Sequence, residues 1–206
     1  MKKIGKGLQF NVYDFGNGRV LKTRRTKFQQ FLISFRWEPY MVFFPWIISK
    51  RIKKADKEVN ESVKYFSTLE YPKKLLGNLE FTKKGIVQDK VIPIKKVIMK
   101  NFGEDKRIID KFAKCVINCW KVGFSDRIFN FTVNNGIGKN GEVILMDFGE
   151  VCFSKGEIKK DILKKRWKRS ACYMFKIFGK TKRYYDEKME KLLTPENVEK
   201  YWPAKV

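Results

Sequence analysis

Asn130 and Asp147, two residues with oxygen-bearing side chains, have the chemistry of metal ligands. Asp147 directly follows an apolar run at residues 143–146, which predicts a strand that ends at the carboxylate. Turn-forming sequences at 134–136 and 140–141 predict that the intervening chain folds back as a hairpin. Amide and carboxylate oxygens suit Mg²⁺, which takes the rest of its coordination shell from water and nucleotide phosphates. The alternative is that Asp147 only ends the strand as a turn residue.

A second group of residues, near the N-terminus, has the composition of a phosphate-binding hairpin. Gly5 and Gly7 lack a Cβ atom, so backbone amides can approach phosphate oxygens closely. Val12 can cover a nucleotide base, and Lys22, which follows two apolar strand residues, can reach the α- and β-phosphates. A turn is expected at residues 16–18. An ordinary two-glycine hairpin with a solvated lysine is the alternative.

The glycine hairpin precedes the candidate metal ligands in the chain. With the two groups in this order, residues 4–150 resemble the protein-kinase-like superfamily. The resemblance implies an α+β, two-lobed protein-kinase-like fold. A small β-rich N-lobe would comprise residues 1–94, and a reduced helical C-lobe residues 95–206. The resemblance also implies ATP and Mg²⁺ as cofactors, with the metal held by Asn130 and Asp147.

The chain departs from the family pattern at the catalytic loop. Asp126 is the residue expected to orient the acceptor hydroxyl and accept its proton, with a loop or cap carboxylate as the alternative role. Phe124 stands where the family has histidine, and Asn130 follows Asp126 after four residues instead of five. Phe10 replaces the third glycine of the hairpin, which predicts a stiffer loop or an aromatic ring over the phosphates. No Ala-Pro-Glu-like triplet follows Gly149, which favours a small-molecule kinase over a typical protein kinase.

Helical periodicity predicts a charged helix at residues 50–69. In the family this helix presents a glutamate to the strand lysine, which here is Lys22. Glu58 lies closer to the apolar side of the helix than Glu61, so the resemblance assigns this role to Glu58. A solvated helix glutamate is the alternative.

The remaining elements follow from strand and helix patterns. Strands are expected at residues 79–81 and 85–94, the second running into a proline-marked connector. In the family this connector is the hinge between the lobes, so backbone groups near Val91 and Ile92 would bond adenine. A helix is expected at residues 106–122, followed by two or three helices after the Asp147 region.

Composition predicts a folded protein in a reducing compartment. The chain has 206 residues, of which 43% are hydrophobic and 15% aromatic, enough for one core or two small ones. The sequence opens without the apolar run of a signal peptide, so we expect a cytoplasmic protein. The cysteines lack the paired spacing of a zinc site, and there is no histidine, so buried thiols are expected. They are Cys115, Cys119, Cys152 and Cys172.

The formal net charge of +24 predicts a polyanionic partner. A basic run at residues 164–169 includes Trp167, which could stack on a base of a nucleic acid. The aromatic segment 40–48 is too short to span a bilayer but can lie in its interface, beside the basic residues 50–54. This segment favours anionic lipid or a phosphorylated glycolipid at the inner face of the membrane. The alternative is that the segment packs between lobes and the basic residues form a solvated face.

The expected function is ATP-dependent phosphoryl transfer to a hydroxyl of a sugar, glycolipid or other small molecule. In this respect the chain is similar to the small bacterial sugar and lipopolysaccharide kinases. A catalytically silent kinase-like scaffold that binds nucleotide or a polyanion is the first alternative, and an atypical protein kinase the second. A basic nucleic-acid-binding protein is the third.

Overall fold

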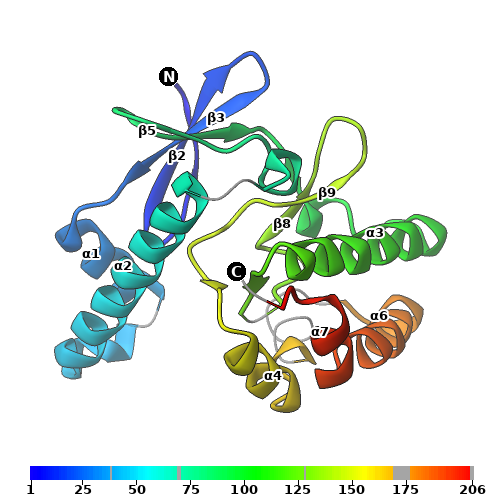
Figure 1. The fold of residues 1–206 in the computed structure, drawn as a ribbon. Coiled ribbons are helices and arrows are strands. Elements are labelled where there is room, and N and C mark those ends of the chain that lie inside the picture. The colour runs from blue at the N-terminus through cyan, green and yellow to red at the C-terminus, as the bar shows by residue number, and fades with distance from the viewer. Residues whose placement is uncertain (38, 69–70, 128, 169–176, 205–206) are drawn as a thin grey trace. The chain divides into compact units, whose positions relative to one another are not determined.

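The structure is a computed structural model that describes residues 1–37, 39–68, 71–127, 129–168 and 177–204. Within these ranges the chain forms α-helices and antiparallel β-sheets, which is compatible with the expected α+β class. The chain divides into two compact units (Figure 1). Unit 1 contains Met1–Glu70 and Asn78–Lys90, and unit 2 contains Tyr71–Gly77 and Val91–Val206. The chain thus enters unit 2 twice, whereas the sequence predicted a single division after residue 94.

The sheet of unit 1 has five antiparallel strands in the order β1-β2-β3-β5-β4. The turn predicted at residues 16–18 is confirmed, since all three residues have positive φ, which glycine and asparagine tolerate best. Leu21 and Val87 pair across β3 and β5 and lie in the core. The strands are β1 (Lys3–Lys6), β2 (Phe10–Gly16), β3 (Arg19–Arg24), β4 (Glu80–Thr82) and β5 (Gly85–Asp89).

Unit 1 also contains the helices α1 (Lys27–Trp37) and α2 (Pro45–Thr68). The helix predicted at 50–69 begins earlier, at Pro45, because proline suits the first turn of a helix; residue 69 lies outside the described part of the chain. The sequence did not predict α1. Its start is stabilised by a reciprocal pair in which Gln29 N donates to Thr26 Oγ1 (3.2 Å) and Thr26 N donates to Gln29 Oε1 (3.3 Å).

The longest helix of unit 2 is α3 (Phe102–Lys121), which begins before the predicted start at residue 106. The Asn101 side chain accepts hydrogen bonds from Gly103 N (2.8 Å) and Glu104 N (3.3 Å), so it caps the first turn. The predicted apolar side of α3 is buried, and Cys115 and Cys119 are buried thiols as expected. Among the described residues that follow are the helices α4 (Lys155–Leu163), α6 (Gly179–Leu192) and α7 (Pro195–Tyr201).

Two small antiparallel sheets complete unit 2, with the orders β6-β8-β9 and β10-β7. The strand predicted at residues 85–94 is wrong in its second half. The pairing with unit 1 strands ends at Asp89, and Ile92 pairs instead with Ile137 of β8. The elements are β6 (Ile92–Pro93), β7 (Ser125–Asp126), β8 (Asn135–Ile137), β9 (Val143–Leu145) and β10 (Val151–Cys152), with the 3-10 helices η1 (Pro39–Phe43), η2 (Lys73–Leu76) and η3 (Ile94–Lys96).

Trp167 is a core residue, which corrects its predicted role in base stacking. Its side chain is 1% exposed and its ring lies 6.0 Å from that of Tyr185. Tyr185 in turn stacks on Phe131, with ring centroids 5.1 Å apart. An indole that fills the core of unit 2 cannot receive a nucleotide base, so the nucleic-acid interpretation loses its aromatic contact.

Ion pairs offset much of the positive charge around α4. Lys155 and Lys159 both bind the Glu199 carboxylate, and these two ammonium groups lower the pKa of Glu199 to about 2. Lys165 and Lys168 pair with Glu190. The described part of the basic run 164–169 is therefore partly neutralised by Glu190 of α6 and by Asp161 of α4, which pairs with Arg166, while Arg169 and Cys172 lie outside the described residues.

None of the helices in the described ranges is both long enough and apolar enough to cross a membrane.

Candidate functional site

Asp126 lies at the end of β7, in the interior of unit 2. Its backbone pairs with Val151 of β10, and Trp120 Nε1 donates to the preceding Ser125 Oγ (3.0 Å). The Asp126 side chain is 7% exposed. A carboxylate this buried requires donors, and its Oδ2 accepts hydrogen bonds from Asn130 N (3.0 Å) and Asn134 Nδ2 (3.2 Å). The backbone N–H of Asn130 thus reaches back to the Asp126 carboxylate.

Phe129 holds this loop in a strained conformation. Its φ of 49° lies in the left-handed region, which is unfavourable for a bulky side chain. The Phe129 ring is fully buried, and it meets Trp120 edge to face at a centroid distance of 6.4 Å. Such backbone strain costs about 1–3 kcal/mol and persists where packing fixes it, most often at functional sites. The strain falls on the residue directly before Asn130.

Asn130 carries a buried oxygen that lacks a hydrogen-bond partner among the described residues. Its side chain is 3% exposed, and Oδ1 accepts no hydrogen bond there. The backbone carbonyl of Asn130, by contrast, accepts from Asn134 N (3.1 Å) and Asn135 Nδ2 (3.0 Å). Leaving a buried polar atom unsatisfied costs about 1–3 kcal/mol, so each case needs an explanation. A cation bound by Asn130 Oδ1 would supply one.

Asn134 joins the Asp126 loop to the segment that carries Asp147. Its carbonyl accepts hydrogen bonds from Met146 N (2.8 Å) and Asp147 N (3.1 Å). Its Nδ2 donates to Glu150 Oε2 (3.3 Å) as well as to Asp126. Asp147 itself is partly exposed, and its Oδ1 accepts from Gly149 N (3.1 Å). Backbone atoms of both predicted metal ligands are thus bonded to the same residue.

The role of Asn134 was not predicted, because residues 134–136 have the composition of a turn. The turn predicted at 140–141 is confirmed, since the chain turns at residues 138–142, where Gly138 N donates to Glu142 O (2.9 Å) and Gly141 has a φ of 73°. Asn135 and Gly136 belong to strand β8, and a Cβ on Gly136 would come within 2.4 Å of Val91 Cγ2. This glycine is needed for close packing rather than for a turn. Asn-Asn-Gly has turn composition, so composition alone carried no signal for the buried role.

The donor set fits Mg²⁺ better than a metal held by protein alone. In the described part of the chain, no group of three or more His, Cys, Asp or Glu side chains could hold a metal ion. Mg²⁺ keeps several waters and is bound through one or two protein oxygens plus phosphates. Asn130 Oδ1 and the partly exposed Asp147 carboxylate can supply such ligands.

In unit 1, Lys22 lies on β3 with its side chain buried, opposite Val12 of β2. Gly5 pairs with Val12, so three of the four residues predicted in the glycine hairpin occupy adjoining strands. Gly7 N donates to Phe10 O (2.9 Å) and closes the turn between β1 and β2. Phe10 is 7% exposed, so the prediction that its aromatic ring lies over the phosphates is wrong. It is a core residue at the start of β2.

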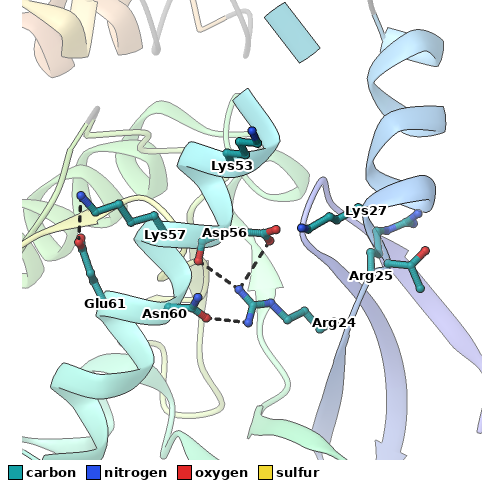
Figure 2. Close-up of a pocket in the computed structure, with 9 residues that line it drawn as sticks. Arg24, Arg25, Lys27, Lys53, Asp56, Lys57, Asn60 and Glu61 are labelled. Carbon is teal, nitrogen blue, oxygen red and sulfur yellow. Dashed lines mark hydrogen bonds and ion pairs between the residues drawn. The ribbon is translucent and has the colours of Figure 1, made fainter. Parts of the chain in front are cut away.

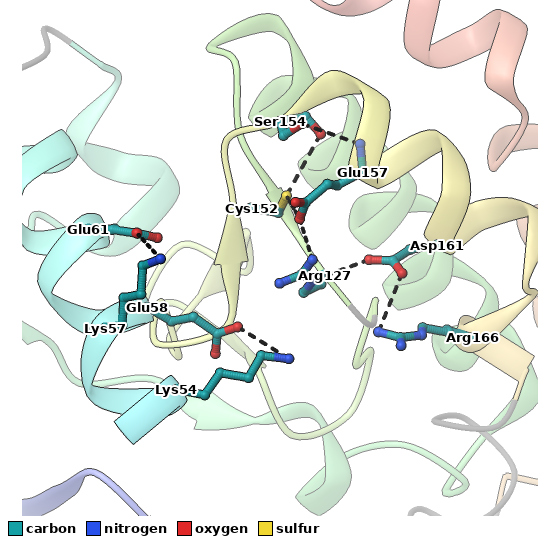
Figure 3. Close-up of polar contacts among 10 residues, drawn as sticks. All are labelled: Lys54, Lys57, Glu58, Glu61, Arg127, Cys152, Ser154, Glu157, Asp161 and Arg166. Atoms are coloured by element: carbon teal, nitrogen blue, oxygen red, sulfur yellow. Dashed lines mark hydrogen bonds and ion pairs between the residues drawn. The ribbon is translucent and has the colours of Figure 1, made fainter. Parts of the chain in front are cut away.

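Glu58 is the better buried of the two glutamates considered on α2. Its side chain is 17% exposed and lies 3.9 Å from Lys54, whereas the Glu61 side chain is 55% exposed and lies 3.8 Å from Lys57 (Figure 3). The difference agrees with the predicted position of Glu58 beside the apolar side of the helix.

Val91 and Ile92, expected to bond adenine, are the first residues of the second segment of unit 2. Ile92 pairs with Ile137, and its side chain is 54% exposed. Lys90, directly before them, donates its backbone N–H to Gly18 O (2.8 Å) in unit 1. The predicted hinge residues therefore follow directly on a chain crossing between the units.

A pocket of about 660 Å³ opens in unit 1 but does not include the predicted nucleotide-binding residues (Figure 2). Arg24 crosses it and donates to Asn60 Oδ1 (2.7 Å) and Asp56 O (3.2 Å), which ties β3 to α2. The guanidinium therefore has a structural role. The lining residues are Arg24, Arg25, Thr26, Lys27, Lys53, Asp56, Lys57, Asn60 and Glu61.

Arg127 fixes the position of the Asp126 loop against α4 (Figure 3). Its backbone N donates to Glu150 O (3.0 Å), and its side chain donates to Asp161 Oδ2 (3.3 Å) and to Glu157. Asp161, which is 5% exposed, also pairs with Arg166 at 3.4 Å. Arg127, the residue next to Asp126, is thus held by two acidic residues of α4. This role of Arg127 was not predicted from the sequence.

Cys152 lies beside this cluster, and burial raises the pKa of its thiol from 9.0 to about 11. We expect native Cys152 to react with iodoacetamide at pH 8 about 100-fold more slowly than a cysteine of ordinary pKa, because only the thiolate reacts. The folded state binds this proton more tightly than the unfolded chain, so the stabilisation is present below pH 9 and is lost as the pH rises towards 11. Mass spectrometry of the Cys152 peptide, labelled before and after unfolding in urea, measures the ratio. Equal rates in the two states would contradict the burial of the thiol.

No model of a known protein family matches this chain, and no curated protein matches it significantly.

Proposed function

We propose that this protein is an ATP-dependent phosphotransferase with a two-lobed, protein-kinase-like fold. The observation that carries the proposal is Asn130 Oδ1, a buried oxygen with no hydrogen-bond partner among the described residues, in a loop held to both Asp126 and the Asp147 segment. The order of elements in unit 1 supports it, since a glycine hairpin, a strand lysine, the helix α2 and two strands follow one another as the resemblance implies, with α1 and η1 inserted before α2. ATP and Mg²⁺ are the proposed cofactors.

Each residue then has a distinct task. Asn130 and Asp147 would hold Mg²⁺, whose charge neutralises phosphate oxygens when it is bound. Lys22 would bind the α- and β-phosphates, and the partly buried Glu58 would orient it. Backbone groups of Val91 and Ile92 would bond adenine, which Val12 would cover, while Gly5 and Gly7 give phosphates access to backbone amides.

Asp126 would act on the acceptor. Its Oδ2 already accepts two hydrogen bonds, which fixes the carboxylate in one orientation. A fixed carboxylate can orient an acceptor hydroxyl and receive its proton as the phosphoryl group transfers. The proposed acceptor is a hydroxyl of a sugar, glycolipid or other small molecule, by analogy with the bacterial kinases that the sequence resembles.

ATP binding tests the proposal through Lys22. We expect Lys22→Met to weaken the binding of Mg²⁺-ATP about a hundredfold, because a positioned charge on the phosphates is removed. Methionine keeps most of the aliphatic volume of this buried side chain, so the fold should survive. Titration calorimetry with ATP and Mg²⁺ measures the change.

The matched control is Lys84→Met, at an exposed position in the turn between β4 and β5. It removes the same charge and should leave ATP affinity unchanged. Equal affinities for the wild type and Lys22→Met would remove Lys22 from the nucleotide site. If the wild type itself fails to bind ATP, the proposed function is wrong.

A silent nucleotide-binding scaffold is the second candidate function. The observation that favours it is the engagement of Asp126 Oδ2 by Asn130 and Asn134, together with the lack of histidine in the chain. Phosphate release separates the two functions: a scaffold binds ATP in the calorimeter but does not hydrolyse it with water or transfer it to added sugars.

A further inference from the structure

A cluster of large apolar side chains is exposed on unit 1, in η1 and the first turn of α2. We call it the apolar tip. Single exposed apolar residues are common, but five within eight positions form a concentrated surface feature. The members and their exposed fractions are Tyr40 61%, Phe43 74%, Phe44 44%, Trp46 64% and Ile47 41%.

The apolar tip is ordered by the helix that carries it. Ile48 and Ile52, which follow directly, are 0% and 5% exposed and anchor the start of α2 in the core of unit 1. Ile47 N donates to Phe44 O (3.0 Å), and the Phe44 and Trp46 rings meet edge to face at 5.4 Å. The buried side of α2 is therefore already occupied by other residues. The aromatic side chains of the tip project from the remaining sides.

Basic residues continue from the tip along the same side of α2. Lys50 and Lys53 follow Trp46 by four and seven positions, which places them on one helix face, and both are exposed. At 1.5 Å per residue they lie about 6 Å and about 10 Å from Trp46 along the helix axis. The sequence has no acidic residue between Glu38 and Asp56. The segment from the tip to Lys54 therefore carries only positive charge.

These spacings match the layers of a bilayer surface. The polar headgroup region on each side of the hydrocarbon core is about 5–8 Å thick, from a core of about 30 Å and a total of about 40–45 Å. A tip inserted into the outer edge of the hydrocarbon, with the helix axis along the bilayer normal, would place Lys50 within the headgroup region and Lys53 just outside it, from where its long side chain can reach lipid phosphates. Aromatic rings favour this interface, and lysines nearby are attracted to anionic lipids.

We propose that unit 1 docks end-on to an anionic phospholipid surface, with the apolar tip inserted and Lys50 and Lys53 among the phosphate groups. A nucleic acid fits the surface less well, because Ile47 among the aromatic rings has no π-face on which a base could stack, whereas an aliphatic side chain can insert among acyl chains. This proposal does not depend on the phosphotransferase activity.

Vesicle sedimentation tests the tip. Wild-type protein should bind vesicles of phosphatidylcholine and phosphatidylserine, and Phe43→Ser/Trp46→Ser should bind at least tenfold more weakly. Phe178→Ser is the matched control, since Phe178 is 64% exposed but belongs to unit 2. It should bind as the wild type does. Melting temperatures of all three proteins should agree, because the replaced side chains are exposed.

The basic stripe is tested in the same assay. Lys50→Glu/Lys53→Glu should lower binding to anionic vesicles at least tenfold, whereas Lys83→Glu/Lys84→Glu, with the same charge change at an exposed turn, should lower it much less. Wild-type binding should also weaken as salt rises from 0.05 to about 0.5 M, as the Debye length shortens. Phosphatidylcholine vesicles alone should bind weakly.

Insertion is tested by fluorescence. Trp46 is exposed whereas Trp120, Trp167 and Trp202 are buried, and Trp37→Phe removes the remaining tryptophan, so brominated lipids should quench emission from Trp46 in Trp37→Phe and quench little in Trp37→Phe/Trp46→Ser. The proposal is overturned if the wild type does not bind anionic vesicles, or if Phe43→Ser/Trp46→Ser binds them as well as the wild type does. It is also overturned if RNA binds the protein and Lys50→Glu/Lys53→Glu leaves vesicle binding unchanged. If the double serine variant melts at a lower temperature, Tyr40→Ser replaces it in the same comparison.

Discussion

Replacing Asp147 by asparagine should lower Mg²⁺-dependent ATP hydrolysis about a thousandfold, with water in the place of the acceptor. Asparagine keeps an oxygen that can accept the hydrogen bond from Gly149 N, so the local turn should remain. The variant loses the negative charge that Mg²⁺ requires. Steady-state phosphate release at saturating Mg²⁺-ATP measures the effect.

Glu187→Gln is the matched control for this change. Glu187 is exposed on α6, and its replacement also removes one negative charge. It should leave turnover and melting temperature unchanged. Wild-type turnover in Asp147→Asn would exclude this carboxylate from the site, and a large fall in melting temperature would show that it acts in folding instead.

Replacing Asp126 by asparagine should lower kcat about 10²–10⁴-fold and leave the KM for ATP nearly unchanged. The carbonyl oxygen of asparagine can still accept hydrogen bonds from Asn130 N and Asn134 Nδ2, so the loop should keep its shape. What is lost is the capacity to accept a proton. The two kinetic constants, measured in a phosphate-release assay, distinguish this role from nucleotide binding.

Asn134→Ala separates chemistry from loop geometry. It removes the Nδ2 that donates to Asp126 and Glu150 but leaves both carboxylates in place. If Asp126 only maintains the shape of the loop, Asp126→Asn and Asn134→Ala should each raise the KM for ATP and lower kcat. A fall in kcat alone, seen only for Asp126→Asn, is the result that the proposed role requires.

The sequence predicted the elements with strong local patterns. Leu21 sits on a strand that follows a Gly-Asn-Gly turn, and the structure confirms both the turn and the strand. The apolar side of α3 was predicted from residues such as Ile109 and Phe112, which are buried. In these places periodicity and turn chemistry point to the same structure, so tertiary contacts add little information.

The failures come from tertiary packing. The segment 85–94 has the sequence pattern of one strand, but its residues belong to two sheets. Val87 pairs with β3, and Ile92 pairs with β8. Trp167 stands in a basic run, yet its indole fills the core beside Tyr185. Neither outcome leaves a local signal. A strand shared by two sheets has the same sequence pattern as a single strand, and a buried tryptophan in a basic run has the same pattern as an exposed one.

The candidate site was predicted only in part for the same reason. Asp126, Asn130 and Asp147 have the order that the resemblance requires, although Asn130 follows Asp126 after four residues instead of five, so they could be named from sequence. Asn134 and Arg127 could not, because their roles depend on partners far along the chain, such as Asp147 and Asp161. Local composition identifies the groups that do chemistry more readily than those that position them.

The left-handed backbone at Phe129 has a consequence for how the loop length can change. A left-handed residue reverses the chain within a short span, which lets Asn130 N reach the Asp126 carboxylate. The buried ring of Phe129 is what keeps that reversal in place. Inserting a residue before Asn130 would therefore withdraw either the ring from the core or the Asn130 amide from Asp126, so the length of this loop and the side chain at position 129 are coupled.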